Sequence, residues 1–115
     1  MQSETLKKNY EFRRLYAKGR SAVAPTLVIY CRPVTGGGNR VGFTVTTRLG
    51  HAVVRNRIRR RLREIYRLHE GELRSGVDMV LVARGRSVTA AYRDLERDYL
   101  VLCRKLNLLR EEGTP

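Results

Sequence analysis

Apolar positions between residues 52 and 70 recur at the spacing of an amphipathic helix. At about 100° per residue, Val54 and four later residues form one apolar stripe: Ile58, Leu62, Ile65 and Tyr66. A stripe of this kind packs against a core, while the rest of the helix stays in solvent. The sequence therefore predicts a helix over about 52–70, ended by Gly71.

The rest of the chain alternates between shorter helix and strand patterns. Helical spacing predicts a first helix over 10–18, with Asn9 as its N-cap, and a last helix over 89–106. Apolar runs predict four strands, over 21–24, 26–32, 40–46 and 77–83. The run VDMVLVA at 77–83 is typical of a strand in a sheet interior. This order favours an α+β fold, with helices packed on a four-stranded sheet.

The length of 115 residues predicts one domain over residues 1–115, which we expect to be structured over about 6–106 with frayed termini. No run approaches the roughly 20 apolar residues of a membrane-spanning helix, and no signal peptide is recognisable, so we expect a cytoplasmic protein without a membrane partner. Cys31 and Cys103 lack neighbours at metal-ligand spacing and are expected to be small apolar fillers.

The charge balance of the sequence indicates a binding function. The chain has 24 Lys and Arg against 11 Asp and Glu, a formal net charge of +13. Self-repulsion of that size indicates a polyanionic partner. Seven of the arginines lie within residues 55–67, where Glu64 is the one acidic residue.

On the helical wheel, the side opposite the apolar stripe carries a continuous basic strip: Arg59, Arg63, Asn56, Arg67 and Arg60. A solvated helix face normally mixes charges of both signs, so this strip is interpreted as a phosphate-binding surface. Arginine binds phosphate in a bidentate manner. Asn56 is the one good candidate for reading a base edge, which favours folded RNA over B-DNA.

A second surface is predicted on the exposed face of the sheet. Tyr30, Thr44 and Thr46 could stack on or hydrogen-bond to a single strand. Phe12 and Tyr16 share a face of the first helix and lie within a basic border.

Candidate catalytic groups are sparse. His51 and His69 lie at opposite ends of the predicted helix over 52–70, and the acidic residues do not cluster. We therefore expect no catalytic residue in the protein and no certain metal site. The residues alone leave two rival classes open: a structural RNA-binding protein such as a ribosomal component, and a DNA-binding regulator.

The segment RNRIRRRLRE at 55–64 is preceded by VGFTVTTRLGHAVV and, further upstream, by LKKNYEFRRLYAKGRS. These three segments closely resemble the protein subunit of bacterial ribonuclease P, and the similarity extends over about residues 6–106. The resemblance implies an α-β-β-β-α-β-α sandwich with an unusual left-handed βαβ crossover. It also implies one protein bound to one catalytic RNA, which removes the 5′ leader of precursor tRNA with Mg²⁺ held mainly by the RNA and substrate. The protein would then be an endoribonuclease subunit that does not itself cleave.

Carried over to this sequence, the family pattern assigns RNA binding to Arg55, Asn56, Arg57, Arg59, Arg60 and Arg63. It assigns the leader-binding cleft to Phe12, Tyr16, Tyr30, Thr44 and Thr46. Further basic contacts are expected from Lys7, Lys8, Arg13, Arg48 and Arg67. Two positions depart from the family pattern: Tyr16 stands where phenylalanine is frequent, and Thr47 where lysine is common.

Overall fold

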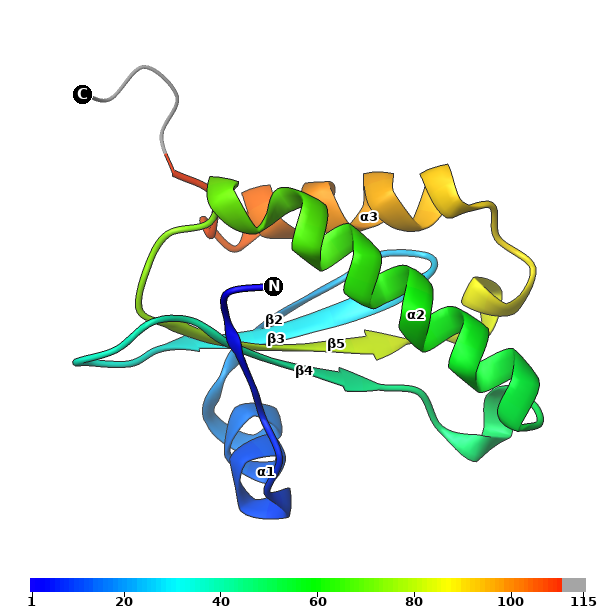
Figure 1. Ribbon diagram of the computed structural model, residues 1–115, viewed down its shortest axis with the longest axis horizontal. Coiled ribbons are helices and arrows are strands. Elements are labelled where there is room, and N and C mark those ends of the chain that lie inside the picture. Colours follow the sequence, from blue (N-terminus) through cyan, green and yellow to red (C-terminus); the bar gives the residue numbers. More distant parts are fainter. Residues whose placement is uncertain (111–115) are drawn as a thin grey trace.

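The centre of the protein is a five-stranded sheet, shown in Figure 1. The computed structural model describes residues 1–110. Across the sheet the strands follow the order β1 (Glu4–Thr5), β4 (Arg40–Thr44), β5 (Val77–Ala83), β3 (Leu27–Pro33) and β2 (Arg20–Val23). β4 is parallel to both β1 and β5, whereas β3 is antiparallel to both β5 and β2. The mixed α+β class is as predicted, and β5, with its nearly continuous apolar run, lies in the centre of the sheet.

The prediction of a four-stranded sheet is wrong because it omits β1. β1 has two residues, which is too short for any alternation of apolar and polar positions to be visible. The residues on either side of β1 are held by hydrogen bonds to segments distant in sequence. Leu6 N donates to Val41 O at 2.9 Å, and Ser3 N donates to a Glu70 carboxylate oxygen at 2.6 Å. Regular secondary structure therefore begins at Glu4, and Ser3 before it is already hydrogen-bonded to the rest of the protein.

Helices cover both faces of the sheet. α1 (Asn9–Lys18) lies on one face, and α2 (Ala52–His69) and α3 (Tyr92–Lys105) lie together on the other (Figure 1). Three short 3₁₀ turns complete the regular structure: Thr47–Leu49, Glu70–Glu72 and Gly85–Val88. The larger core lies under α2 and α3, and a smaller cluster built on Leu6, Leu15 and Val80 lies under α1.

The apolar stripe of α2 faces the sheet as predicted. Ile58, Leu62, Ile65 and Tyr66 are all buried. Each fully buried side chain of this size contributes about 1.5–3 kcal/mol, so the stripe fixes both the position of α2 and the direction of its basic side. Gly50 precedes the helix with a φ of 142°, in the region that favours glycine.

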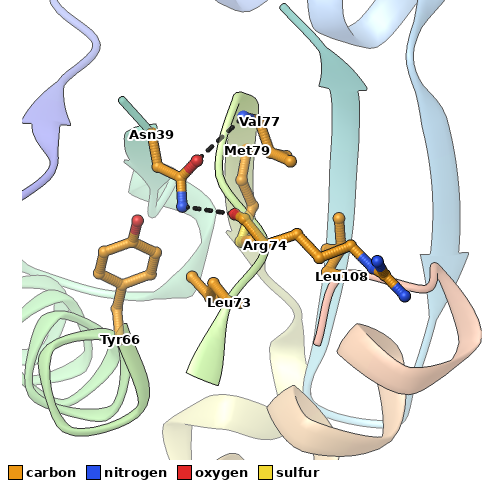
Figure 2. A pocket seen from close by; sticks show the side chains of 7 residues that line it. All are labelled: Asn39, Tyr66, Leu73, Arg74, Val77, Met79 and Leu108. Carbon is orange, nitrogen blue, oxygen red and sulfur yellow. Dashed lines mark hydrogen bonds between the residues drawn. The ribbon is translucent and has the colours of Figure 1, made fainter. Parts of the chain in front are cut away.

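The side chain of Asn39 joins the beginnings of β4 and β5, which α2 separates in sequence. Its Nδ2 donates to Arg74 O at 2.9 Å, and its Oδ1 accepts from Val77 N at 2.9 Å (Figure 2). Tyr66 and Leu73 line the same pocket. Asn39 thereby satisfies backbone groups that lie before the ladder between the two strands begins.

Several predicted boundaries differ from the observed ones. The strand expected over 40–46 ends at Thr44, and the helix expected over 89–106 begins at Tyr92 after a 3₁₀ turn. Lys8, and not Asn9, is the N-cap of α1, because Asn9 is already helical. The handedness of the crossover through α2 stays a prediction. No helix in residues 1–110 is long and apolar enough to cross a membrane.

The first residues of the tail that was expected to be frayed, 107–115, contact the rest of the protein. Arg110 N donates to Glu72 O at 2.8 Å, and Leu109 forms a β-bridge with Leu73. The rest of that tail, residues 111–115, lies outside the described residues.

Candidate nucleic-acid interface

α2 presents a basic outer strip to solvent, made of Asn56, Arg59, Arg60, Arg63 and Arg67. The Arg59 guanidinium donates to Asn56 Oδ1 at 3.1 Å, and Arg63 lies over the Phe43 ring at 5.8 Å from its centroid. Within residues 1–110, the side chain of Arg60 makes no hydrogen bond or ion pair. Arg67 pairs with Glu64 at 2.7 Å. The strip is therefore a set of guanidinium groups on a rigid helix, with one acidic side chain beside it.

Three other arginines of α2 donate hydrogen bonds to backbone carbonyl oxygens of neighbouring segments. Arg57 donates to Val88 O and Arg61 to Ala90 O, each at 3.3 Å, so both lean toward the segment that leads into α3. Arg55 Nε donates to Gly50 O at 3.1 Å, at the entry to the helix. Of the six predicted RNA-facing residues, four lie on the outer strip, whereas Arg55 and Arg57 lie at its edges. Each still has free donors for a phosphate.

A second candidate surface lies where α1 meets the sheet. The rings of Tyr16 and Tyr30 meet edge to face, with centroids 5.0 Å apart. The hydroxyl groups of Tyr16 and Thr44 form a hydrogen bond of 2.8 Å, which joins α1 to β4. Three of the five predicted leader-binding residues are thus in direct contact. The hydroxyl that sets Tyr16 apart from phenylalanine makes one of these contacts.

Phe12 packs on the sheet above Gly42. A β carbon built on Gly42 would lie 2.5 Å from Phe12 Cε1, so the glycine makes room for the ring. Phe12 belongs to the small cluster under α1 and is half-buried. Thr46, by contrast, does not join the other four. It lies beyond the end of β4, is exposed, and precedes the 3₁₀ turn Thr47–Leu49.

Strand pairing adds apolar residues to this second surface that the sequence did not single out. Thr44 is paired with Val82, Val82 with Val28, and Val28 with Val23, and directly paired residues share a face of a sheet. Val82 and Val28 are half-buried, and Val23 is 53% exposed. We call Phe12, Tyr16, Tyr30, Thr44 and these three valines the α1 surface. The alternation of β3 indicated the face that Val28 occupies, but the nearly continuous apolar run of β5 does not show which face Val82 occupies.

The additional basic residues surround both surfaces without forming a cluster of their own. All five have exposed side chains: Lys7, Lys8, Arg13, Arg48 and Arg67. The first three lie at or before α1, Arg48 lies in the turn before α2, and Arg67 lies on the outer strip. Positive charge therefore borders the α1 surface and continues along α2, which suits a polyanion larger than either surface.

The described residues hold few groups suited to catalysis. His51 precedes α2 and His69 ends it, which places them about 27 Å apart at 1.5 Å per residue. Both ring nitrogens of His69 are hydrogen-bonded to carboxylates: Nδ1 lies 2.5 Å from Glu72 Oε2, and Nε2 lies 2.7 Å from Glu96 Oε2. No group of three or more His, Cys, Asp or Glu in residues 1–110 is placed to hold a metal ion.

Comparisons with known proteins agree with this geometry. The sequence model of the family described as Ribonuclease P matches residues 1–107. The chain is 42% identical to the ribonuclease P protein component of Alkaliphilus metalliredigens, over 95% of this chain and 99% of that protein. The relative from Natranaerobius thermophilus is 39% identical over 93% of each chain.

Solved structures give the same result. The RNase P protein of Staphylococcus aureus superposes with a TM-score of 0.86 at 25% identity, covering 95% of this chain and 100% of that one. The RNase P protein from Thermotoga maritima superposes with a TM-score of 0.79 at 25% identity, covering 88% and 96%. The sequence matches and the shared fold lead to one conclusion: this chain belongs to the ribonuclease P protein component family.

Proposed function

We propose that this protein binds the catalytic RNA of ribonuclease P through the outer strip of α2 and holds the 5′ leader of precursor tRNA on the α1 surface. The observation that carries this proposal is the position of the two surfaces on opposite faces of one sheet (Figure 1). A folded RNA gripped at its phosphates and a single strand stacked on aromatic rings can then be bound at the same time.

The two surfaces suit these two partners for different reasons. Arginines on a helix have fixed spacing, and their planar donors match phosphate oxygens in a bidentate manner. The α1 surface offers the exposed Tyr16 and the half-buried Tyr30 beside three valines, which suits unpaired bases. Because stacking accepts every base, the protein would hold leaders of varied sequence.

In this proposal the RNA carries out the hydrolysis and the protein supplies binding. The Mg²⁺ required for hydrolysis would be held mainly by the RNA and the substrate, since the described donors of this chain form no metal cluster. One protein would bind one RNA in the cytoplasm. The part of the protein in the reaction is then to raise the affinity for tRNA that still carries its leader.

Reconstitution with a bacterial ribonuclease P RNA transcript tests the proposal. We expect the protein to stimulate cleavage of precursor tRNA at low magnesium, and Phe12→Ala to reduce the preference for precursor over mature tRNA. Loss of one stacked base corresponds to about 1–3 kcal/mol. Absence of stimulation by the native chain would refute the proposal. Cleavage by the protein alone would overturn the assignment of catalysis to the RNA.

A further inference from the structure

A partly buried ion-pair network holds α1 on the sheet next to the α1 surface. Arg40 on β4 donates from Nε and Nη2 to the two oxygens of Asp78, at 2.9 and 2.6 Å. The remaining terminal nitrogen, Nη1, reaches Glu11 Oε2 on α1 at 2.5 Å. One guanidinium therefore joins two strands and a helix.

The two carboxylates of this network are well shielded from solvent. The side chain of Asp78 is 6% exposed, that of Glu11 13% and that of Arg40 33%. Asp78 is directly paired with Arg40 in the parallel ladder between β4 and β5, so the sheet itself sets the position of the guanidinium. With two acidic groups around one basic group, Arg40 adds no net positive charge that would attract RNA.

Glu11 transmits this fixed position to α1. Its Oε1 accepts hydrogen bonds from Lys8 N at 3.0 Å and Lys7 N at 3.1 Å, at the beginning of the helix, while its Oε2 binds Arg40. The Lys8 N–H lowers the pKa of Glu11, with further contributions from Lys7 and Arg40 that outweigh the opposing effect of burial. The carboxylate is thus kept ionised, and both of its oxygens are used.

The residues that follow Glu11 are those of the α1 surface. Phe12 is next in sequence, and Tyr16 lies one turn further along the same side of the helix. On β4, Arg40 and Gly42 are two residues apart and share a face. The contact between Arg40 and Glu11 is therefore adjacent to Gly42, on which the Phe12 ring packs. A rotation of α1 would displace both aromatic rings.

From this geometry we infer that Arg40 is a positioning residue for leader binding: through Glu11 it sets the rotation of α1 and so places Phe12 and Tyr16. The inference rests on the proposed function of the α1 surface. Arg40 itself does not contact the leader. Release of α1 lowers the fraction of molecules with the rings in place, and the apparent affinity for the leader falls by that fraction.

Glu11→Gln is the most selective variant for a test. A glutamine oxygen can still accept from Lys7 N and Lys8 N, so the cap remains while the charge opposite Arg40 is lost. Arg40→Lys keeps the charge but not the fork geometry that reaches both carboxylates, and it should give an intermediate loss. Arg32→Gln is a control for an arginine beside Asp78 that lacks a contact with α1, because Arg32 is paired with Asp78 from the other neighbouring strand and, within residues 1–110, its side chain makes no hydrogen bond or ion pair.

The experiment measures the ratio of dissociation constants for mature and precursor tRNA with the reconstituted holoenzyme, and amide hydrogen exchange of the protein. We expect Glu11→Gln to lower this ratio by about ten-fold or more, because loss of a charge-assisted hydrogen bond reduces the fraction of molecules with α1 in place. Exchange should accelerate in α1 and stay unchanged in α2. Affinity for the RNA subunit should also be unchanged, and Arg32→Gln should keep the native ratio.

Four results would count against this role. An unchanged ratio in Glu11→Gln would overturn the inference and leave the proposed function intact. Equal losses of leader preference and RNA-subunit affinity, with faster exchange in both helices, would show general destabilisation instead. An equal loss in Arg32→Gln would show that leader preference depends on any arginine beside Asp78, and not on the contact between Arg40 and Glu11. Absence of any leader preference in the native protein would overturn the proposed function and the inference together.

Discussion

Gly42 is the position where the packing of the α1 surface can be tested most directly. In Gly42→Ala the new methyl carbon would lie 2.5 Å from Phe12 Cε1 and 2.7 Å from Cζ, whereas ordinary contacts begin near 3.4 Å. The ring must therefore move by about 1 Å, and overpacking of this kind costs about 1–3 kcal/mol. Alanine also restricts the unfolded chain, which stabilises by about 0.4–1 kcal/mol. We expect a net destabilisation of about 1–2 kcal/mol.

Thermal unfolding followed by circular dichroism measures this loss. For a domain of this size, a loss of 1 kcal/mol lowers the midpoint by about 4 °C, so a decrease of roughly 4–8 °C is expected. Gly37→Ala is the matched control, because a β carbon at Gly37 meets no atom within 4 Å. It restricts the unfolded chain in the same way without a clash, and its midpoint should not decrease.

A double-mutant cycle with Phe12→Ala identifies the source of the effect. If the clash with the ring causes the loss, Gly42→Ala should cost little once the ring is absent. A loss of the same size in the Phe12→Ala background would refute this reasoning, and so would an unchanged midpoint for the single variant. Because α1 bears the displaced ring, Gly42→Ala should also weaken leader preference while RNA binding through α2 stays intact.

Two further predictions concern charge. Replacing Arg59 and Arg63 together by alanine should flatten the dependence of RNA affinity on salt, by roughly 0.7–0.9 in log-log slope per lost phosphate contact. Burial opposes protonation of His69, but hydrogen bonds to Glu96 and Glu72 raise its pKa above the usual value. The ion pairs of protonated His69 contribute about 1 kcal/mol or less to the free energy of unfolding. This contribution is fully present below about pH 6.5 and is lost as the pH rises through the pKa of His69 in the folded protein. Denaturant titrations at several pH values measure the loss.

Each of these two predictions has a control within the chain. Arg93 and Arg104 are exposed on α3, so their double replacement by alanine removes the same charge away from the outer strip. Equal flattening by that control would show that net charge, and not the strip, determines binding. His69→Gln should remove the pH-dependent step; a step of unchanged size would assign the titration to another group.

The features that are local in sequence could be predicted. The apolar stripe of α2 repeats every three or four residues, and burial of Ile58, Leu62 and Ile65 follows from that spacing alone. The basic strip opposite it follows from the same geometry. The nearly continuous apolar run of β5, interrupted by Asp78, indicated an interior strand, and β5 lies between β4 and β3. In each case a single segment carries the information, because one helix or strand determines its own faces.

The tertiary structure decided what depends on contacts between distant segments. The network that joins Glu11, Arg40 and Asp78 spans three elements, and it exists because a parallel register places Arg40 opposite Asp78. The same register brings Val82 beside Thr44 on the α1 surface. β1 went undetected because two residues show no periodicity and their partner strand lies 36 residues away, with Glu4 opposite Arg40. Strand register is set by packing of the whole sheet, and no single segment contains it.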